Sequence, residues 1–157
     1  MARRMLKDEI CETVGSEIDF SVMADAVGYA LRRAQLYVYQ DFIETFAAEG
    51  IRPPDFAVLM VLSRNPGLKQ SEVAEALGIQ RANFVAIIDG LEGRKLAERR
   101  KSETDRRVQC LFITKAGLAY LDELKPIWKS HEDRVVARLG GPQARDQLVQ
   151  LLGRLYD

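Results

Sequence analysis

Basic side chains gather in one short stretch of an otherwise neutral chain. The 157 residues hold 23 Lys and Arg against 23 Asp and Glu, so the formal net charge is zero. Residues 94–107 alone carry Arg94, Lys95, Arg99, Arg100, Lys101, Arg106 and Arg107 against Glu98, Glu103 and Asp105. A bound phosphate feels charges within a Debye length of about 8–10 Å, so this stretch can bind nucleic acid whatever the net charge. A solvated surface loop is the alternative that the stretch by itself leaves open.

Other kinds of chemistry find little support in the residue types. With Cys11, Cys110 and the single histidine His131, neither a disulfide framework nor a metal site is expected. The sequence has no paired catalytic carboxylates, no nucleophile–histidine–acid pattern and no glycine-rich phosphate loop, so we expect neither an enzyme nor a bound cofactor. It has no apolar run of about 18 residues, and no apolar region follows the basic residues at its start, so we expect no secretory signal. We therefore expect a cytoplasmic protein that does not enter a membrane.

The elements that must position the basic stretch are mainly helices. Apolar periodicity and turn signals predict helices over 21–49, 53–64, 70–77, 81–95 and 115–139, and a last one from Pro142. The second and third of the short helices meet at Gly78, which is the helix-turn-helix arrangement. Extended runs over 97–100 and 108–113 flank a polar loop. The predicted fold class is mainly α with a small β-wing.

The helix predicted over 21–49 has two apolar stripes. Nearly thirty helical residues would span about 40 Å, which is longer than a compact monomer of this size needs. We interpret the helix as a strut that packs against its own domain on one side and against a second chain on the other. A long core helix of a monomer is the alternative.

The order of these elements resembles the MarR family of bacterial transcriptional regulators. The resemblance rests on residues 70–79 (QSEVAEALGI), 89–92 (DGLE), 96–99 (LAER), 105–107 (DRR, the family's D-x-R) and 111–117 (LFITKAG). It implies a homodimer of winged helix-turn-helix lobes, with residues 1–50 and 115–157 as the helical dimerisation region and 51–114 as the DNA-binding lobe. It also implies a double-stranded, pseudo-palindromic operator and a repressor that a small ligand releases.

Within this resemblance, the helix that begins at Arg81 can enter the major groove. Gln80, Arg81 and Asn83 carry side chains of the kinds that read base edges. The wing can reach the adjacent minor groove, where Arg107, oriented by Asp105, suits the negative potential of narrow A·T stretches. The predicted phosphate contacts, which set the register on DNA, are Lys69, Ser71, Arg99 and Arg106. For Arg94 and Lys95, DNA contact and a solvated surface both stay open.

The family places its ligand pocket between the strut helices and the DNA-binding lobe. Aromatic walls with a cation nearby can hold an aromatic acid or a phosphate. The predicted lining is Tyr29, Arg32, Arg33, Tyr37, Phe56, Met60, Trp128 and His131. The alternative for Phe56, Met60 and Trp128 is that they are core residues, and for Arg33 an interfacial salt bridge.

The chain is also similar to the family's regulators of hydroxycinnamate breakdown, some of which respond to acyl-coenzyme A thioesters. This similarity implies a p-coumaroyl- or feruloyl-type thioester as the effector, with Arg32 and Arg33 on its phosphates. A free aromatic carboxylate is the alternative effector. A winged helix used only for protein–protein contact is the alternative function.

Overall fold

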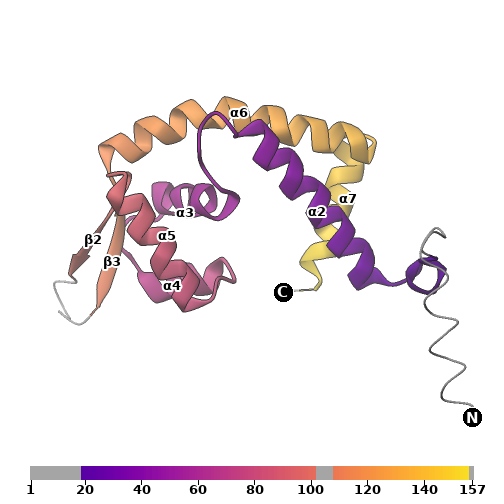
Figure 1. Ribbon diagram of the computed structural model, residues 1–157, viewed down its shortest axis with the longest axis horizontal. Coiled ribbons are helices and arrows are strands. Elements are labelled where there is room, and N and C mark those ends of the chain that lie inside the picture. The colour runs from indigo at the N-terminus through magenta and orange to yellow at the C-terminus, as the bar shows by residue number, and fades with distance from the viewer. Residues whose placement is uncertain (1–18, 102–107, 156–157) are drawn as a thin grey trace, which may run out of the picture. The chain divides into compact units, whose positions relative to one another are not determined.

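The computed structural model describes residues 19–101 and 108–155 (Figure 1). The described residues belong to two units, with the division between Leu36 and Tyr37. The first contains the 3-10 helix η1 (Ser21–Met23) and the beginning of α2 (Val27–Thr45), which ends in the second. In the first unit the rings of Phe20 and Tyr29 stack, with 5.9 Å between their centroids.

The prediction of one continuous helix over 21–49 is wrong at both ends. Asp19 accepts hydrogen bonds from the amide (2.8 Å) and the hydroxyl (3.1 Å) of Ser21, so a separate short turn starts there. Residues 46–50 form turns that end at Gly50, whose φ of +60° lies in the left-handed region. The helix is therefore 19 residues long, which corresponds to about 28 Å.

The three helices of the lobe match the predictions to within two residues. They are α3 (Pro53–Arg64), α4 (Gln70–Ala76) and α5 (Arg81–Gly93). Two prolines open α3, where a missing amide hydrogen costs nothing. Arg52 donates two hydrogen bonds of 2.9 Å to the buried carboxylate of Asp55, which fixes the approach of the chain to that helix.

The wing is an antiparallel sheet with the strand order β1-β3-β2. Its strands are β1 (Leu68–Lys69), β2 (Ala97–Lys101) and β3 (Gln109–Ile113). The sequence predicted β2 and β3 but not β1, because a two-residue strand has no period to detect. β1 pairs with β3, with Leu68 opposite Leu111 and Lys69 opposite Cys110. Since Lys69 directly precedes α4, this pairing connects the sheet to the start of that helix.

One hydrophobic core in the second unit contains residues of the lobe together with residues before and after it in the chain. Its fully buried side chains come from α3, α4, α5, β3 and α6, and from Phe46, which directly follows α2. They include Phe46, Leu59, Leu62, Phe84, Ile88, Leu91, Leu111, Leu121 and Leu124. Packing is thus continuous across the predicted domain boundary at 50/51, and the assignment of 1–50 and 115–157 to dimerisation stays a prediction.

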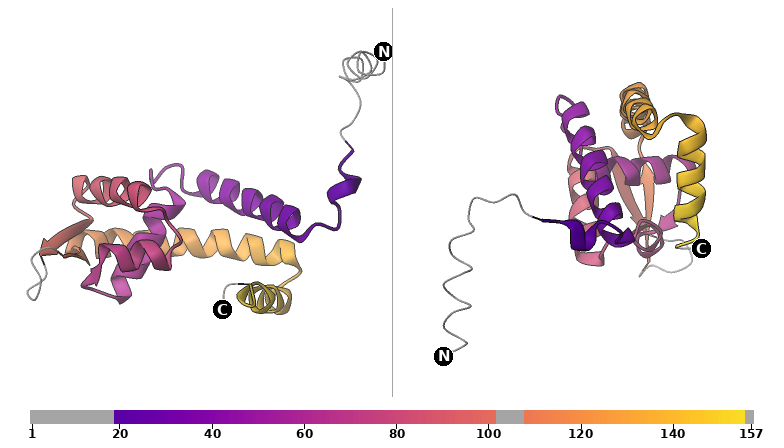
Figure 2. Two further views of the ribbon diagram at one scale, coloured as in Figure 1. Left: turned by 90° about the horizontal axis from the view of Figure 1, so that it is seen from below. Right: turned by 90° about the vertical axis from the view of Figure 1, so that its right-hand side faces the viewer.

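Two helices complete the second unit, α6 (Lys115–Leu139) and α7 (Pro142–Gly153). The side chain of Thr114 accepts a hydrogen bond of 2.9 Å from the amide of Gly117, which confirms the predicted N-cap. Gly140 and Gly141 have positive φ angles, and the chain turns there so that α7 leaves in a new direction (Figure 2). No described residue of α7 is buried.

No helix in the described ranges combines the length and apolarity that a bilayer span requires.

Candidate nucleic-acid interface

The turn between α4 and α5 sets which face of α5 is exposed. Gly78 has a φ of +62°, and the amide of Ile79 donates to the carbonyl of Ala74 at 2.9 Å. Phe84 and Ile88 lie fully buried on the inner face of α5. The polar start of the helix therefore faces outward. Its exposed residues include the predicted base readers Gln80, Arg81 and Asn83.

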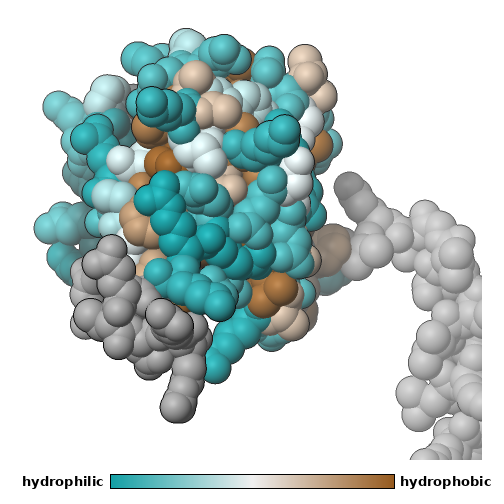
Figure 3. Space-filling view, turned by 90° about the vertical axis from the view of Figure 1, so that its left-hand side faces the viewer, coloured by the Kyte–Doolittle hydropathy of each residue, from teal (hydrophilic) through white to brown (hydrophobic). Residues whose placement is uncertain are grey.

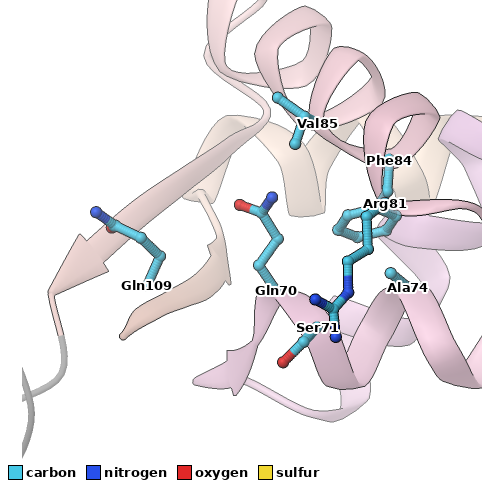
Figure 4. Close-up of a pocket in the computed structure, with 7 residues that line it drawn as sticks. All are labelled: Gln70, Ser71, Ala74, Arg81, Phe84, Val85 and Gln109. Atoms are coloured by element: carbon cyan, nitrogen blue, oxygen red, sulfur yellow. The ribbon is translucent and has the colours of Figure 1, made fainter. Parts of the chain in front are cut away.

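A hollow of about 410 Å³ lies beside this polar face, between α4, α5 and β3. Figure 4 shows the side chain of Arg81 extending toward Ser71, while Gln70 points into the space below Val85. The lining residues are Gln70, Ser71, Ala74, Arg81, Phe84, Val85 and Gln109. Hydrogen-bond donors and acceptors on an apolar floor suit the edges of bases and the phosphate backbone.

The sequence prediction missed Gln70 and Gln109 as members of this surface. Glutamine pairs well with adenine, so its residue type is a usable signal. Gln109 lies beside the helices because β3 pairs with β1 and β2. This pairing is a long-range contact, which the local sequence pattern does not reveal. Ser71 lies exposed on the rim, as a phosphate contact requires.

Lys69 immediately precedes α4. Its amide donates to a carboxylate oxygen of Glu72 at 2.8 Å, and its ammonium lies 3.6 Å from the other oxygen. Glu72 therefore satisfies the amide of the N-cap residue, although Lys69 stands there in place of the usual capping hydroxyl. The lysine side chain is 55% exposed, so its predicted phosphate contact stays a prediction.

The wing exposes a strongly polar surface. Figure 3 looks onto the side where β2 and β3 lie and shows mainly hydrophilic residues with small apolar patches. The guanidinium of Arg100 lies 4.4 Å from the ring centroid of Phe112 and also pairs with Glu98. The predicted DNA contacts Asp105, Arg106 and Arg107 lie outside the described residues.

Arg99 is placed differently from the predicted phosphate contact. Its guanidinium pairs with Asp89 at 2.8 Å and with Glu92, and its side chain is only 18% exposed. A guanidinium held between two carboxylates has few donors left for DNA, so the structure offers no support for a phosphate contact. The sequence does not reveal this pairing because the partners lie seven to ten positions away on another element.

The side chain of Arg94 contacts other residues of the chain. One Nη donates to the carbonyl of Gly50 at 3.2 Å, and the guanidinium lies 4.9 Å from the ring centroid of Tyr120. The hydroxyl of Tyr120 in turn donates to the carbonyl of Glu49 at 2.9 Å. Arg94 thus connects the end of α5 with the loop before α3 and with α6. Lys95 is exposed, with a φ of +59°.

Four of the predicted ligand contacts occupy core positions in the second unit. Phe56 and His131 are buried, and Met60 and Trp128 pack against the same core. The ring of His131 meets Phe42 edge-on and its Nδ1 lies 2.6 Å from a carboxylate oxygen of Asp41. A ligand would have to displace these contacts, so the structure favours packing roles, and ligand binding by these residues stays a prediction.

The remaining predicted ligand contacts lie on α2. Arg32 donates to Gln35 at 3.1 Å, and Arg33 lies 5.9 Å from the ring centroid of Tyr29 in the first unit. Tyr37, in the second unit, lies under the guanidinium of Arg138 at 4.4 Å. A pocket shared by the two units stays a prediction.

The electrostatics of the second unit centre on Asp41. The hydrogen bond from Arg134, followed by that from His131, lowers the pKa of Asp41 to about 2. The same carboxylate raises the pKa of Arg134 above its ordinary value. In the described residues no group of histidine, cysteine and carboxylate side chains has the arrangement of a metal site.

Comparison with known proteins assigns this arrangement to a family. The MarR family model matches residues 49–108, which include both helices of the helix-turn-helix. A relative from Thauera aromatica, described as a putative transcriptional regulatory protein for the hcr operon, is 34% identical over 142 residues. The alignment covers 90% of this chain and 85% of that relative.

Solved structures of the repressor CouR have the same fold. CouR bound to a 23-mer DNA duplex is 42% identical, with a TM-score of 0.84 and coverage of 90% of this chain and all of that one. CouR bound to p-coumaroyl-CoA is 40% identical, with a TM-score of 0.80 over 88% of this chain and 97% of that one. The chain belongs to the MarR family and is a winged helix-turn-helix transcriptional repressor of that type, not an enzyme.

Proposed function

We propose that the chain acts as a homodimer on a pseudo-palindromic operator, with α5 in the major groove and the wing in the adjacent minor groove. The observation that carries the proposal is the exposed polar start of α5 beside the hollow that Gln70, Arg81 and Gln109 line. The likeness to CouR bound to a DNA duplex supports this orientation. Such a regulator acts where chromosomal DNA lies, which is the cytoplasm.

The proposed effector is an aromatic acyl-coenzyme A thioester, with p-coumaroyl-CoA as the first candidate, and the regulated genes serve aromatic-acid breakdown. The likeness to CouR bound to p-coumaroyl-CoA supports the effector. Arg32 and Arg33 supply two exposed cations on one helix for its phosphates. A free aromatic carboxylate is the second candidate, since one arginine beside an aromatic ring is enough to hold it.

Two mechanisms of release follow from this placement. A ligand between the strut helices and the lobe would hold the lobes away from the separation of about 34 Å that successive major grooves require. Alternatively, the phosphates of coenzyme A would repel or cover the DNA. Both mechanisms predict that ligand and operator compete. In the first, each favours a different state of the dimer. In the second, the ligand phosphates repel the DNA or occupy its surface.

The DNA-binding proposal is tested by fluorescence anisotropy with promoter fragments from beside the chain's own gene. The affinity should fall steeply as salt rises, with a slope of about −0.9 per neutralised phosphate. A scrambled duplex of equal length is the control for sequence preference. A winged helix that serves only protein–protein contact would bind neither duplex in dilute buffer.

The effector proposal is tested by adding p-coumaroyl-CoA, p-coumarate and coenzyme A separately to the protein–operator complex. We expect the thioester to dissociate the complex at micromolar concentration and to raise the thermal midpoint of the free protein, as a ligand of the folded state does. Coenzyme A alone controls for phosphate binding. If p-coumarate releases the operator and the thioester does not, the free aromatic carboxylate is the effector and the thioester proposal is wrong.

A further inference from the structure

Arg99 holds the base of the wing by contacts in several directions. Its Nε donates to the side-chain oxygen of Gln70 at 3.1 Å, and one Nη lies 3.4 Å from the carbonyl of Val85. The other Nη lies 2.8 Å from Asp89 and also contacts Glu92. The backbone amide of Arg99 donates to the second oxygen of Glu92 at 2.6 Å.

These contacts join three elements that the proposed function requires to act together. Arg99 belongs to β2, and Gln70 is the first residue of α4. Val85, Asp89 and Glu92 follow one another at spacings of four and three residues, so they lie along one face of α5. The planar guanidinium with its fixed donors is suited to such a junction, and the point charge of a lysine is not.

The charge of this junction argues against direct contact with DNA. One guanidinium and two carboxylates together carry a net negative charge, which repels a phosphate rather than attracts it. The neighbouring Arg100 provides the contrast, because its side chain is 60% exposed and pairs with the single carboxylate of Glu98. The two adjacent arginines of β2 therefore occupy opposite environments.

We infer that Arg99 is a positioning residue that fixes the wing relative to α5 and thereby raises operator affinity without touching DNA. The inference rests on the proposed function. An α5 helix and a wing held at one angle bind two grooves as a single pre-organised unit, and the second contact is then nearly intramolecular. A wing that swings loses this advantage although each of its DNA-contacting side chains is still present.

The first test compares operator affinity across a salt series for Arg99→Gln, Arg99→Lys and the control Arg100→Gln. Each variant is measured at a temperature where circular dichroism shows it folded. We expect Arg99→Gln to bind about ten- to a hundredfold more weakly with an unchanged salt slope, and lysine to rescue little. A salt slope that becomes about 0.9 less steep, with full rescue by lysine, would indicate a phosphate contact and overturn the inference.

A second test changes the partners and leaves Arg99 in place. Asp89→Asn combined with Glu92→Gln removes two negative charges, so a free Arg99 that contacts phosphate would bind DNA more tightly. The positioning role predicts weaker binding instead, because the carboxylates that hold the guanidinium are lost. Tighter or unchanged binding would count against it.

A third measurement needs no DNA. Hydrogen exchange of the β2 amides in the free protein should be faster in Arg99→Gln than in Arg100→Gln, since only the first releases the strand from α5. Equal exchange in the two variants would refute the positioning role even if the protein binds its operator. A wild-type protein that binds no duplex would refute the proposed function, and the exchange result would still decide whether Arg99 holds the wing.

Discussion

The Nδ1 atom of His131 in α6 lies 2.6 Å from a carboxylate oxygen of Asp41 in α2, and the histidine side chain is only 3% exposed. Arg134, one turn of α6 further on, donates to both oxygens of the same carboxylate at 3.2 and 2.8 Å. It also contacts the hydroxyl of Thr45. The end of α2 is therefore attached to α6 through one carboxylate, in addition to the packing of Phe42 and Phe46.

This carboxylate makes the stability of the protein depend on pH in the acid range. Arg134 and His131 lower the pKa of Asp41 from 3.8 to about 2. Because the pKa is lower in the folded state, the contribution of Asp41 is complete above about pH 4 and is lost as the pH falls toward 2. Urea denaturation between pH 6 and pH 3 should show the free energy of unfolding falling below pH 4. The Asp41→Asn variant should have a lower free energy of unfolding at pH 6, and that free energy should fall less steeply with pH than in the wild type. Parallel pH curves for the two proteins would show that Asp41 does not cause the pH dependence.

Gly117 leaves no space for a side chain. A Cβ atom there would lie 2.0 Å from the carbonyl oxygen of Leu96 and 2.8 Å from Ile113. We expect Gly117→Ala to lower the free energy of unfolding by about 3 kcal/mol, because backbone must move. The matched control is Gly90→Ala in α5, where nothing lies within 4 Å. That variant should be about 0.5–1 kcal/mol more stable than wild type. Chemical denaturation measures both, and equal effects would contradict the prediction.

Arg81 is the cation at the start of α5 and beside the hollow. Among the residues that the structure describes, no ion pair engages it, so its side chain is available to a base or a phosphate. We expect Arg81→Ala to weaken operator binding by about 1–3 kcal/mol, with stability little changed. Lys129→Ala in α6 removes a cation of another surface and should leave the affinity unchanged. Anisotropy titrations of both variants at one salt concentration measure the two affinities. A similar loss of affinity in both variants would mean that only the net charge of the protein matters and that Arg81 has no specific contact.

The leucines of α7 are exposed in a single chain. Leu151 is 56% exposed, Leu148 lies three residues earlier on the same side of the helix, and Leu155, just after the end of α7, is 66% exposed. Contiguous apolar side chains of this kind mark an interface between chains. We expect Leu151→Asp to shift the protein from dimer to monomer in light scattering and to lower operator affinity. Gln150→Asp in the same helix should remain dimeric, and a wild-type monomer at micromolar concentration would contradict the dimeric proposal.

Local signals in the sequence were sufficient for most of the elements. Thr114 caps α6, and Pro53 opens α3, because these residue types satisfy or lack backbone donors whatever surrounds them. Gly78 follows the end of α4, and Gly50 closes the turns that follow α2, because glycine reaches positive φ at little cost. The order of the helices, together with the residue types around Arg81 and the wing, was enough to indicate a DNA-binding regulator.

Long-range packing decided what those local signals could not. β1 exists only because β3 lies beside it. Arg99 and His131 have residue types that suit a phosphate and a ligand. Their partners Glu92 and Asp41 come from other elements, seven and 90 positions away. A charged or polar side chain takes whichever partner the fold brings within hydrogen-bond distance. The sequence by itself therefore determined the kinds of elements and the class of protein, and the tertiary structure alone decided which polar side chains are already occupied.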